Sequence, residues 1–279
     1  MTHNILMRFP GGKTKALTLS YDDGVEQDVR LIQIMRQNGL KGTFNINSGL
    51  YAKEGTVYPE GHIHRRMTRK QCVQLYRENG MEVAVHGLTH PFLYRLSENQ
   101  STYEVIQDRM NLENEFETIV RGMAYPYGPC NDKLVEVLKS CGIVYSRTTV
   151  STEKFDIPVD WLRLPPTCHH NNPRLMELAH QFVETGEDQT PALFYLWGHS
   201  YEFEQNDNWN VIEEFAKYLG NREDIWYAAN IEIYDYVTAY QQLIFSTDGK
   251  RIYNPAALTV YLLMDGVSVC VKPGEQISV

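Results

Sequence analysis

Two adjacent carboxylates follow a short apolar segment near the start of the chain. The sequence "LTLSYDDG" carries Asp22 and Asp23 from an expected strand at residues 16–20 into a glycine turn. Like charges side by side repel each other, so a purely structural turn would rarely contain this pair. Two interpretations stay open at this point: a solvated surface turn, or two carboxylates with a cation between them.

Histidines stand at the ends of two other apolar segments. His86 and His90 lie four residues apart in "VHGLTHPF", and His199 ends the segment "YLWGH". Two neutral imidazoles and one carboxylate are a common ligand set for a catalytic zinc or a related divalent ion. A lone histidine pair at this spacing is a weak signal, and a single strand-end histidine is more often buried and hydrogen-bonded. Three such histidines together with an acidic pair favour a metal site.

Short apolar segments alternate with amphipathic segments along most of the chain. The expected strands include residues 16–20, 42–46, 81–86, 143–147, 192–197 and 225–229. The expected helices cover residues 27–39, 68–80, 98–119, 131–142, 173–185, 208–219 and 231–244. This alternation predicts an α/β fold with a parallel sheet of about seven strands, closed into a barrel whose active site lies at the carboxyl ends of the strands.

The longest expected helix and the C-terminal region carry their own predictions. In the helix at 98–119 the apolar spacing places a core-facing stripe at Tyr103, Ile106, Met110, Leu112, Phe116 and Ile119. After residue 245 the pattern changes, and "TVYLLMDGVSVCV" predicts a hairpin with its turn at Asp-Gly. We expect a barrel over residues 1–245 and a small β-rich extension over residues 246–279.

Composition excludes several classes of protein. The 279 residues carry a formal net charge of −9, and no run of Lys and Arg is present, which argues against nucleic-acid binding. No apolar run is long enough to span a bilayer. The first twenty residues contain no signal-peptide pattern, so we expect a cytoplasmic location. The five cysteines are scattered and form no CxxC pair, which is typical of reduced thiols. The oligomeric state is not predicted.

Four motifs together resemble a known family. "LSYDDG", "HGLTH", "AYPYG" and "LWGH" follow the order and approximate spacing of the polysaccharide deacetylase (NodB-like) family, carbohydrate esterase family four, and the resemblance covers about residues 14–240. It implies a distorted (β/α) barrel and a metal-dependent hydrolase that removes acetyl groups from an N- or O-acetylated carbohydrate. Zinc is the expected ion, with cobalt, nickel and iron also admissible for a His₂Asp site.

The resemblance also implies roles for individual residues. Asp23, His86 and His90 resemble the metal ligands of the family, and Asp22 resembles its general base. His199 resembles the general acid that protonates the leaving group.

The "AYPYG" motif agrees with the family in one position and departs from it in another. Tyr127 resembles the residue whose backbone N–H faces the developing oxyanion. The family often has arginine where this chain has Ala124. Arg121 lies three residues earlier, and Arg147 is our candidate for a compensating cation near the base; a plain surface arginine is an equally good interpretation.

The fourth motif of the family usually contains an Asp followed by Trp. "FDIPVDWLRLPP" offers Asp160 before Trp161, with Asp156 as a rival for the carboxylate that orients His199. Trp161 and Trp209 are candidate substrate-stacking residues, because aromatic faces stack on sugars.

Four other histidines lie in polar loops. For His62 and His64 we favour solvated or rim positions, and for His169 and His170 a plain loop with possible substrate contact at its rim.

Two alternative functions stay open. The same fold could hydrolyse a small cyclic amide or ureide, as an allantoinase-like enzyme does. A catalytically silent carbohydrate-binding module is less favoured, because the base, the metal ligands and the acid are all retained.

Overall fold

The structure is a computed structural model that describes residues 4–185 and 190–279. Its helices are α1 (Asp28–Gln37), α2 (Arg69–Glu78), α3 (Glu98–Phe116), α4 (Asp132–Ser140), α5 (Leu175–Glu184), α6 (Tyr201–Gln205), α7 (Trp209–Leu219) and α8 (Asn230–Gln241). The strands of the main sheet are β2 (Lys15–Asp22), β3 (Gly42–Ile46), β4 (Glu82–Val85), β5 (Gly122–Ala124), β6 (Tyr145–Arg147), β7 (Cys168–His169), β8 (Ala192–Gly198) and β9 (Ile225–Tyr227).

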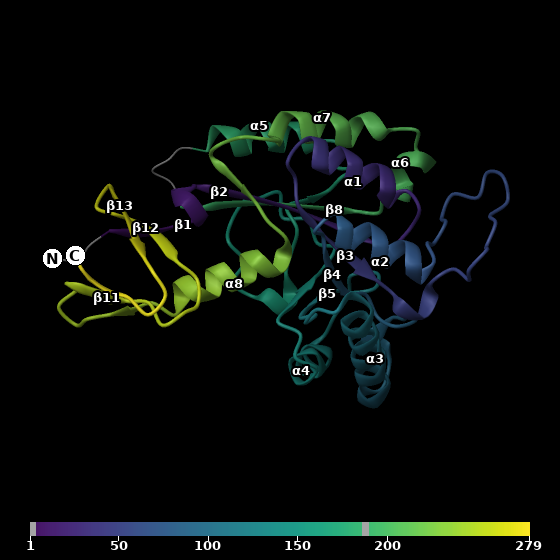
Figure 1. Ribbon diagram of the computed structural model, residues 1–279, viewed down its shortest axis with the longest axis horizontal. Helices are drawn as coiled ribbons and strands as arrows, with labels where there is room; N and C mark the ends of the chain where they lie inside the picture. Colours follow the sequence, from purple (N-terminus) through teal and green to yellow (C-terminus); the bar gives the residue numbers. More distant parts are fainter. Residues whose placement is uncertain (1–3, 186–189) are drawn as a thin grey trace.

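These strands form one parallel sheet in the order β6-β5-β4-β3-β2-β8-β7. Strand β9 pairs with Lys15–Leu17, the part of β2 that β3 does not reach. Helices α1, α5 and α7 lie together along one side of this sheet, while α3 and α4 lie on another side (Figure 1). The predicted distorted barrel of about seven parallel strands is therefore confirmed.

The two faces of β2 have opposite chemistry, because side chains alternate along a strand. Leu17 and Leu19 belong to the main apolar core, together with residues of α1, α5 and α7. On the other face, Ser20 and Asp22 both accept hydrogen bonds from the Asn45 side chain. The apolar core thus lies between the sheet and its helices, and the inner face of the sheet presents polar groups.

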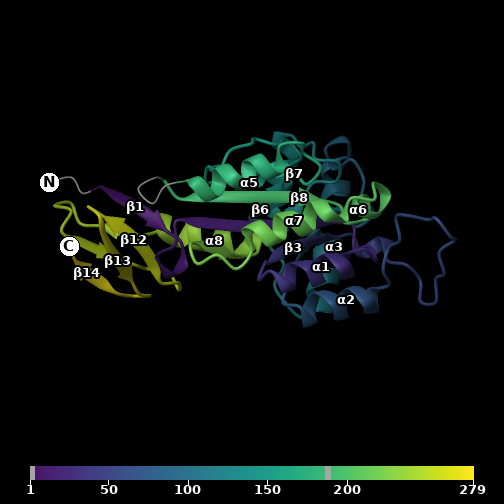
Figure 2. The ribbon, with the colours of Figure 1, turned by 90° about the horizontal axis from the view of Figure 1, so that it is seen from above.

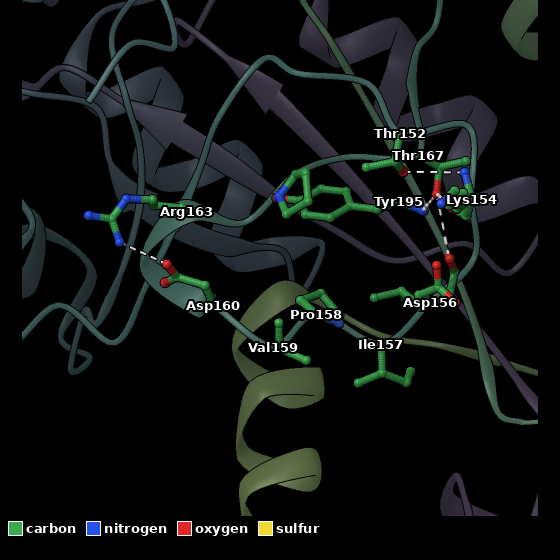
Figure 3. Close-up of a pocket in the computed structure, with 12 residues that line it drawn as sticks. Thr152, Lys154, Asp156, Ile157, Pro158, Val159, Asp160, Arg163, Thr167 and Tyr195 are labelled. Atoms are coloured by element: carbon green, nitrogen blue, oxygen red, sulfur yellow. Dashed lines mark hydrogen bonds and ion pairs between the residues drawn. The ribbon is translucent and has the colours of Figure 1, made fainter. Parts of the chain in front are cut away.

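The barrel does not close by strand pairing between β6 and β7. On that side β6 makes a single bridge instead, between Arg147 and Leu164 of the segment that leads to β7. A pocket of about 430 Å³ opens beside this segment, and its lining includes Asp156 and Asp160 (Figure 3).

The strands outside the barrel gather at one end of the molecule (Figure 1). One three-stranded sheet contains β1 (Ile5–Arg8), β12 (Val260–Met264) and β13 (Val267–Val271). The other contains β10 (Ile244–Phe245), β11 (Arg251–Tyr253) and β14 (Gln276–Ser278). Helix α8 lies between these strands and the barrel, and the loop before α2 projects at the opposite end, as Figure 2 also shows. Strand β1 pairs with β12, so a strand from the start of the chain joins the C-terminal strands. The domain boundary at residue 245 stays a prediction.

The stripe expected on the long helix is only partly right. Leu112 and Phe116 are buried, but Tyr103, Met110 and Ile119 are exposed. The buried positions are instead Ser101, Val105, Asp108, Leu112 and Phe116. Asp108 accounts for the shift: its carboxylate accepts the backbone N–H groups of Ser48 and His86, so a polar residue takes a core-facing place.

Within the described ranges, no helix combines the length and the apolar character that a membrane-spanning helix needs.

Candidate active site

The predicted catalytic residues come together at the carboxyl ends of the central strands. Asp22 is the last residue of β2, and the neighbouring register pair Tyr21–Gly198 places His199, the residue directly after β8, beside it. His86 follows β4 directly. The Nε2 atoms of His86 and His199 each lie 3.7 Å from Oδ2 of Asp22.

Asp22 is a buried carboxylate with strong partners on both oxygens. Asn45 donates to Oδ1 at 2.8 Å, and Arg147 forms an ion pair with Oδ2. Burial by itself would raise the pKa of Asp22, but the charges of Arg147, His86 and His199 outweigh it and hold the pKa below its ordinary value. Asp22 is therefore ionised at neutral pH and can accept a proton.

Arg147 is a buried residue, and only 1% of it is exposed, so the surface interpretation is wrong. Its guanidinium lies over the ring of Trp197, 4.3 Å from the ring centroid, while it pairs with Asp22. Arg121, the other candidate, instead forms a bidentate ion pair with Asp235. The cation beside Asp22 thus comes from β6, next to the strand that carries Ala124.

Asp23, His86 and His90 form a compact group. One potential ligand atom of each lies within 4.8 Å of those of the other two. Nδ1 of His86 lies 2.8 Å from the carbonyl oxygen of Ala124. A carbonyl can only accept, so Nδ1 carries the proton and Nε2 presents its lone pair. Burial lowers the pKa of His86, and it lowers that of His90 to about 4, so both imidazoles are neutral.

This group fits a divalent cation. It offers two neutral imidazoles and an ionised carboxylate, which is the donor set that zinc and related ions accept. Asp23 has φ 84°, a left-handed conformation that is costly for a non-glycine residue and that is often found at functional sites.

Two residues of the loop before α2 also contact Asp23. Arg66 donates to Oδ1 at 3.0 Å, and Nε2 of His64 lies 3.1 Å from Oδ2. For His64 we expected a solvated or rim position; the structure places it against a predicted metal ligand, with its side chain 38% exposed. No local pattern indicated this contact, because 41 residues separate the two positions.

His199 is oriented by Glu202, which the sequence reading missed. Nδ1 of His199 lies 3.2 Å from Oε1 of Glu202. Burial by itself would lower the pKa of His199, but Glu202 and the charges of Asp22 and Asp23 raise it above its ordinary value. Because Nδ1 faces the Glu202 carboxylate, Nε2 is the nitrogen that faces Asp22.

Neither aspartate expected to orient His199 is recorded in contact with it. Asp160 caps the 3₁₀ turn Trp161–Arg163 and pairs with Arg163, as Figure 3 shows. Asp156 lines the same pocket. None of the residues that line this pocket belongs to the predicted catalytic group.

The predicted substrate-binding residues lie in different surroundings. Tyr127 is 53% exposed, has φ 64°, stacks on Phe92 and places its ring edge-on to His90. Trp161 packs edge-on against Tyr234, and Trp209 packs against Phe203 under Arg30. Of the three, only Tyr127 contacts the predicted metal group in the described part of the chain.

Residues 10–146, just under half of the chain, match the family model for polysaccharide deacetylases. This confirms the resemblance that the motifs indicated. No curated protein matches the chain by sequence.

Solved structures of the same class have a similar fold. A candidate polysaccharide deacetylase from Mycobacterium smegmatis is 17% identical, with a TM-score of 0.62 over 86% of this chain and 96% of that chain. The chitin deacetylase of Colletotrichum lindemuthianum is 20% identical, with a TM-score of 0.52 over 82% and 89% of the two chains. A family 4 carbohydrate esterase from Streptomyces lividans, solved with acetate, is 20% identical, with a TM-score of 0.50 over 74% and 88%.

Proposed function

We propose that the protein is a metal-dependent hydrolase that removes acetyl groups from an N- or O-acetylated carbohydrate. The observation that carries this proposal is the position of Asp22 between two histidines of opposite character. His86 presents a lone pair, while His199 presents a nitrogen that can carry a proton, and both lie 3.7 Å from the same carboxylate oxygen.

The resident cation would be held by Asp23, His86 and His90. A divalent ion bound there polarises an acyl carbonyl and makes water more acidic. Zinc is the ion we expect, with cobalt, nickel and iron as alternatives.

Asp22 acts as the general base in this proposal. Its low pKa keeps it ionised, and Asn45 and Arg147 fix its two oxygens in place. The carboxylate accepts a proton from the attacking water, while Arg147 keeps the buried negative charge compensated before the transfer.

His199 acts as the general acid. Glu202 keeps Nδ1 occupied, so the proton on Nε2 is the one delivered to the departing amine or alcohol. The amide of Tyr127 is the proposed donor to the developing oxyanion. In the described part of the chain no hydrogen-bond partner is recorded for this N–H, which leaves it free to serve a ligand.

The test combines metal analysis with acetate release from acetylated chitin, xylan and peptidoglycan fragments. We expect bound metal, acetate release and loss of both after treatment with a strong chelator. Hydrolysis that persists in a fully chelated protein would contradict the mechanism. Turnover of a cyclic amide or ureide without acetate release would favour the other hydrolase, and metal binding without turnover of any substrate would favour the silent module.

A further inference from the structure

A second group of imidazoles surrounds a carboxylate next to the predicted active site. Oε2 of Glu202 lies 3.1 Å from Nε2 of His169 and 2.9 Å from Nε2 of His170. Its other oxygen, Oε1, is hydrogen-bonded to Nδ1 of His199. His169 ends β7 and pairs in register with Trp197, so it stands at the same edge of the sheet as His199. By composition alone this group could hold a metal ion.

The protonation state of His169 argues against a metal there. The backbone N–H of Asn171 donates to Nδ1 of His169 at 3.1 Å. Nδ1 must therefore be the acceptor nitrogen, and in the neutral ring Nε2 carries the proton. A nitrogen that carries a proton cannot bind a metal, but it can donate to the Glu202 oxygen that it faces.

We propose that His169 is a positioning residue for the deacetylation reaction: it holds Glu202 by one oxygen, so that the other oxygen keeps His199 turned with Nε2 toward Asp22. This inference rests on the proposed function of His199 as the acid. It assigns to His169 a role that acts through Glu202, without contact with the reacting atoms.

The surroundings of His169 suit this role. Its ring packs edge-on against Trp197 at 4.5 Å, and Trp197 in turn covers Arg147, the partner of the base. Nε2 of the buried His170 lies 2.9 Å from Oε2 of Glu202 without hydrogen-bond geometry, and its ring stacks on Phe203. The ring of His170 packs so closely against Gly198 that a larger residue has no room there: a Cβ at position 198 would lie 2.0 Å from Nδ1 of His170. His169 is thus fixed by its neighbours and by a backbone N–H before substrate binds.

Glu202 is ionised, as this arrangement requires. Burial by itself would raise the pKa of Glu202, but the close contacts with His169, His170 and His199 lower it well below its ordinary value. Without His169, one oxygen of the carboxylate loses a donor, and the carboxylate gains freedom to rotate away from His199.

The experiment compares His169→Leu, His169→Gln and a matched control, His180→Leu. His180 lies exposed on α5 against Tyr218, away from the site. We expect His169→Leu to lower kcat by about tenfold to a hundredfold, as loss of an outer supporting contact typically does, with KM nearly unchanged. Glutamine can place an N–H near the position of Nε2, so His169→Gln should recover much of the rate. The control should match the wild type.

Two further readouts make the proposal falsifiable. The ¹⁵N signals of His199 should show a proton held on Nδ1 in the wild type and in His169→Gln, and exchange broadening of that proton in His169→Leu. Metal content should be the same in all variants. A rise in KM with unchanged kcat would overturn the proposal in favour of a substrate contact, and loss of one metal ion in His169→Leu would overturn it in favour of a metal site.

Failure of the proposed function is distinguishable from failure of this inference. If the wild type releases no acetate, the function is wrong, but the His199 signals still decide whether His169 acts on it. Unchanged kcat and unchanged His199 signals in a folded His169→Leu protein would overturn the inference alone.

Discussion

Two groups, each made of histidines and a carboxylate, lie beside Asp22. They contain the same types of residue, but we assign them different roles. In the first, His86 and His90 lie beside Asp23, and the carbonyl of Ala124 fixes the His86 proton on Nδ1. In the second, His169, His170 and His199 surround Glu202, and a backbone N–H fixes the His169 proton on Nε2.

In both groups the backbone partner of a histidine determines which of its nitrogens carries the proton. A carbonyl partner leaves a lone pair toward the site, which suits a cation; an N–H partner leaves a proton toward the site, which suits a carboxylate. Ligand composition alone cannot separate the two groups. Substitutions in each of the two groups test this assignment.

His86→Ala should have the largest effect. It removes the nitrogen whose lone pair faces the predicted cation, so we expect loss of bound metal and a fall in acetate release of more than about a thousandfold. Metal analysis and acetate assays check both outcomes. His180→Ala, the matched control, should keep metal and activity. A full complement of metal in His86→Ala would refute the first group as a cation site.

Asp22→Asn separates the base from the metal ligands. The substitution keeps the size of the side chain but removes the proton acceptor, so kcat should fall by about a hundredfold to ten-thousandfold. Bound metal should stay at the wild-type level, because Asp22 is not a proposed ligand. Asp248→Asn, at an exposed position between β10 and β11, is the control. Near-normal turnover in Asp22→Asn would remove the assignment of the base.

Glu202→Gln tests the second group through pH. The pKa of His199 is lowered by burial and raised by Glu202, Asp22 and Asp23, so loss of the Glu202 charge should lower it. The acid is active only while protonated, and activity falls as pH rises through its pKa. The alkaline limb of kcat against pH should therefore move to lower pH, with kcat reduced by about tenfold to a hundredfold.

The control for this pH shift is Glu177→Gln, an exposed position on α5 where Glu177 pairs with Arg174. Its profile should coincide with that of the wild type. An unmoved alkaline limb in Glu202→Gln would show that Glu202 does not act on His199.

Much of the fold could be predicted from local patterns, because each βα unit carries its own apolar strand and capped helix. The family motifs lie directly after strands, so their residues were expected to meet at one edge of the sheet, as Asp22, His86 and His199 do. Contacts between segments far apart in the sequence were harder to predict. The pairing of β1 with β12 joins residues about 250 positions apart and leaves no local signal.

The sequence motifs did not predict the residues that lie outside the motifs and contact the motif residues. Glu202 follows His199 by three residues on the short helix α6, a spacing that could have pointed to it in place of Asp156 or Asp160. Asp108 was hidden because a polar residue on a core-facing side breaks the expected stripe of α3. Arg147 was a candidate, but only its burial distinguishes a partner of Asp22 from a surface arginine.

The most direct test of the central claim is the number of metal ions per chain in the wild type, His86→Ala and His169→Leu. Purified proteins loaded with zinc and freed of excess metal would be measured by elemental mass spectrometry. We predict one ion, none and one ion, respectively. Two ions in the wild type, or one ion that His86→Ala keeps and His169→Leu loses, would contradict the assignment of the two groups.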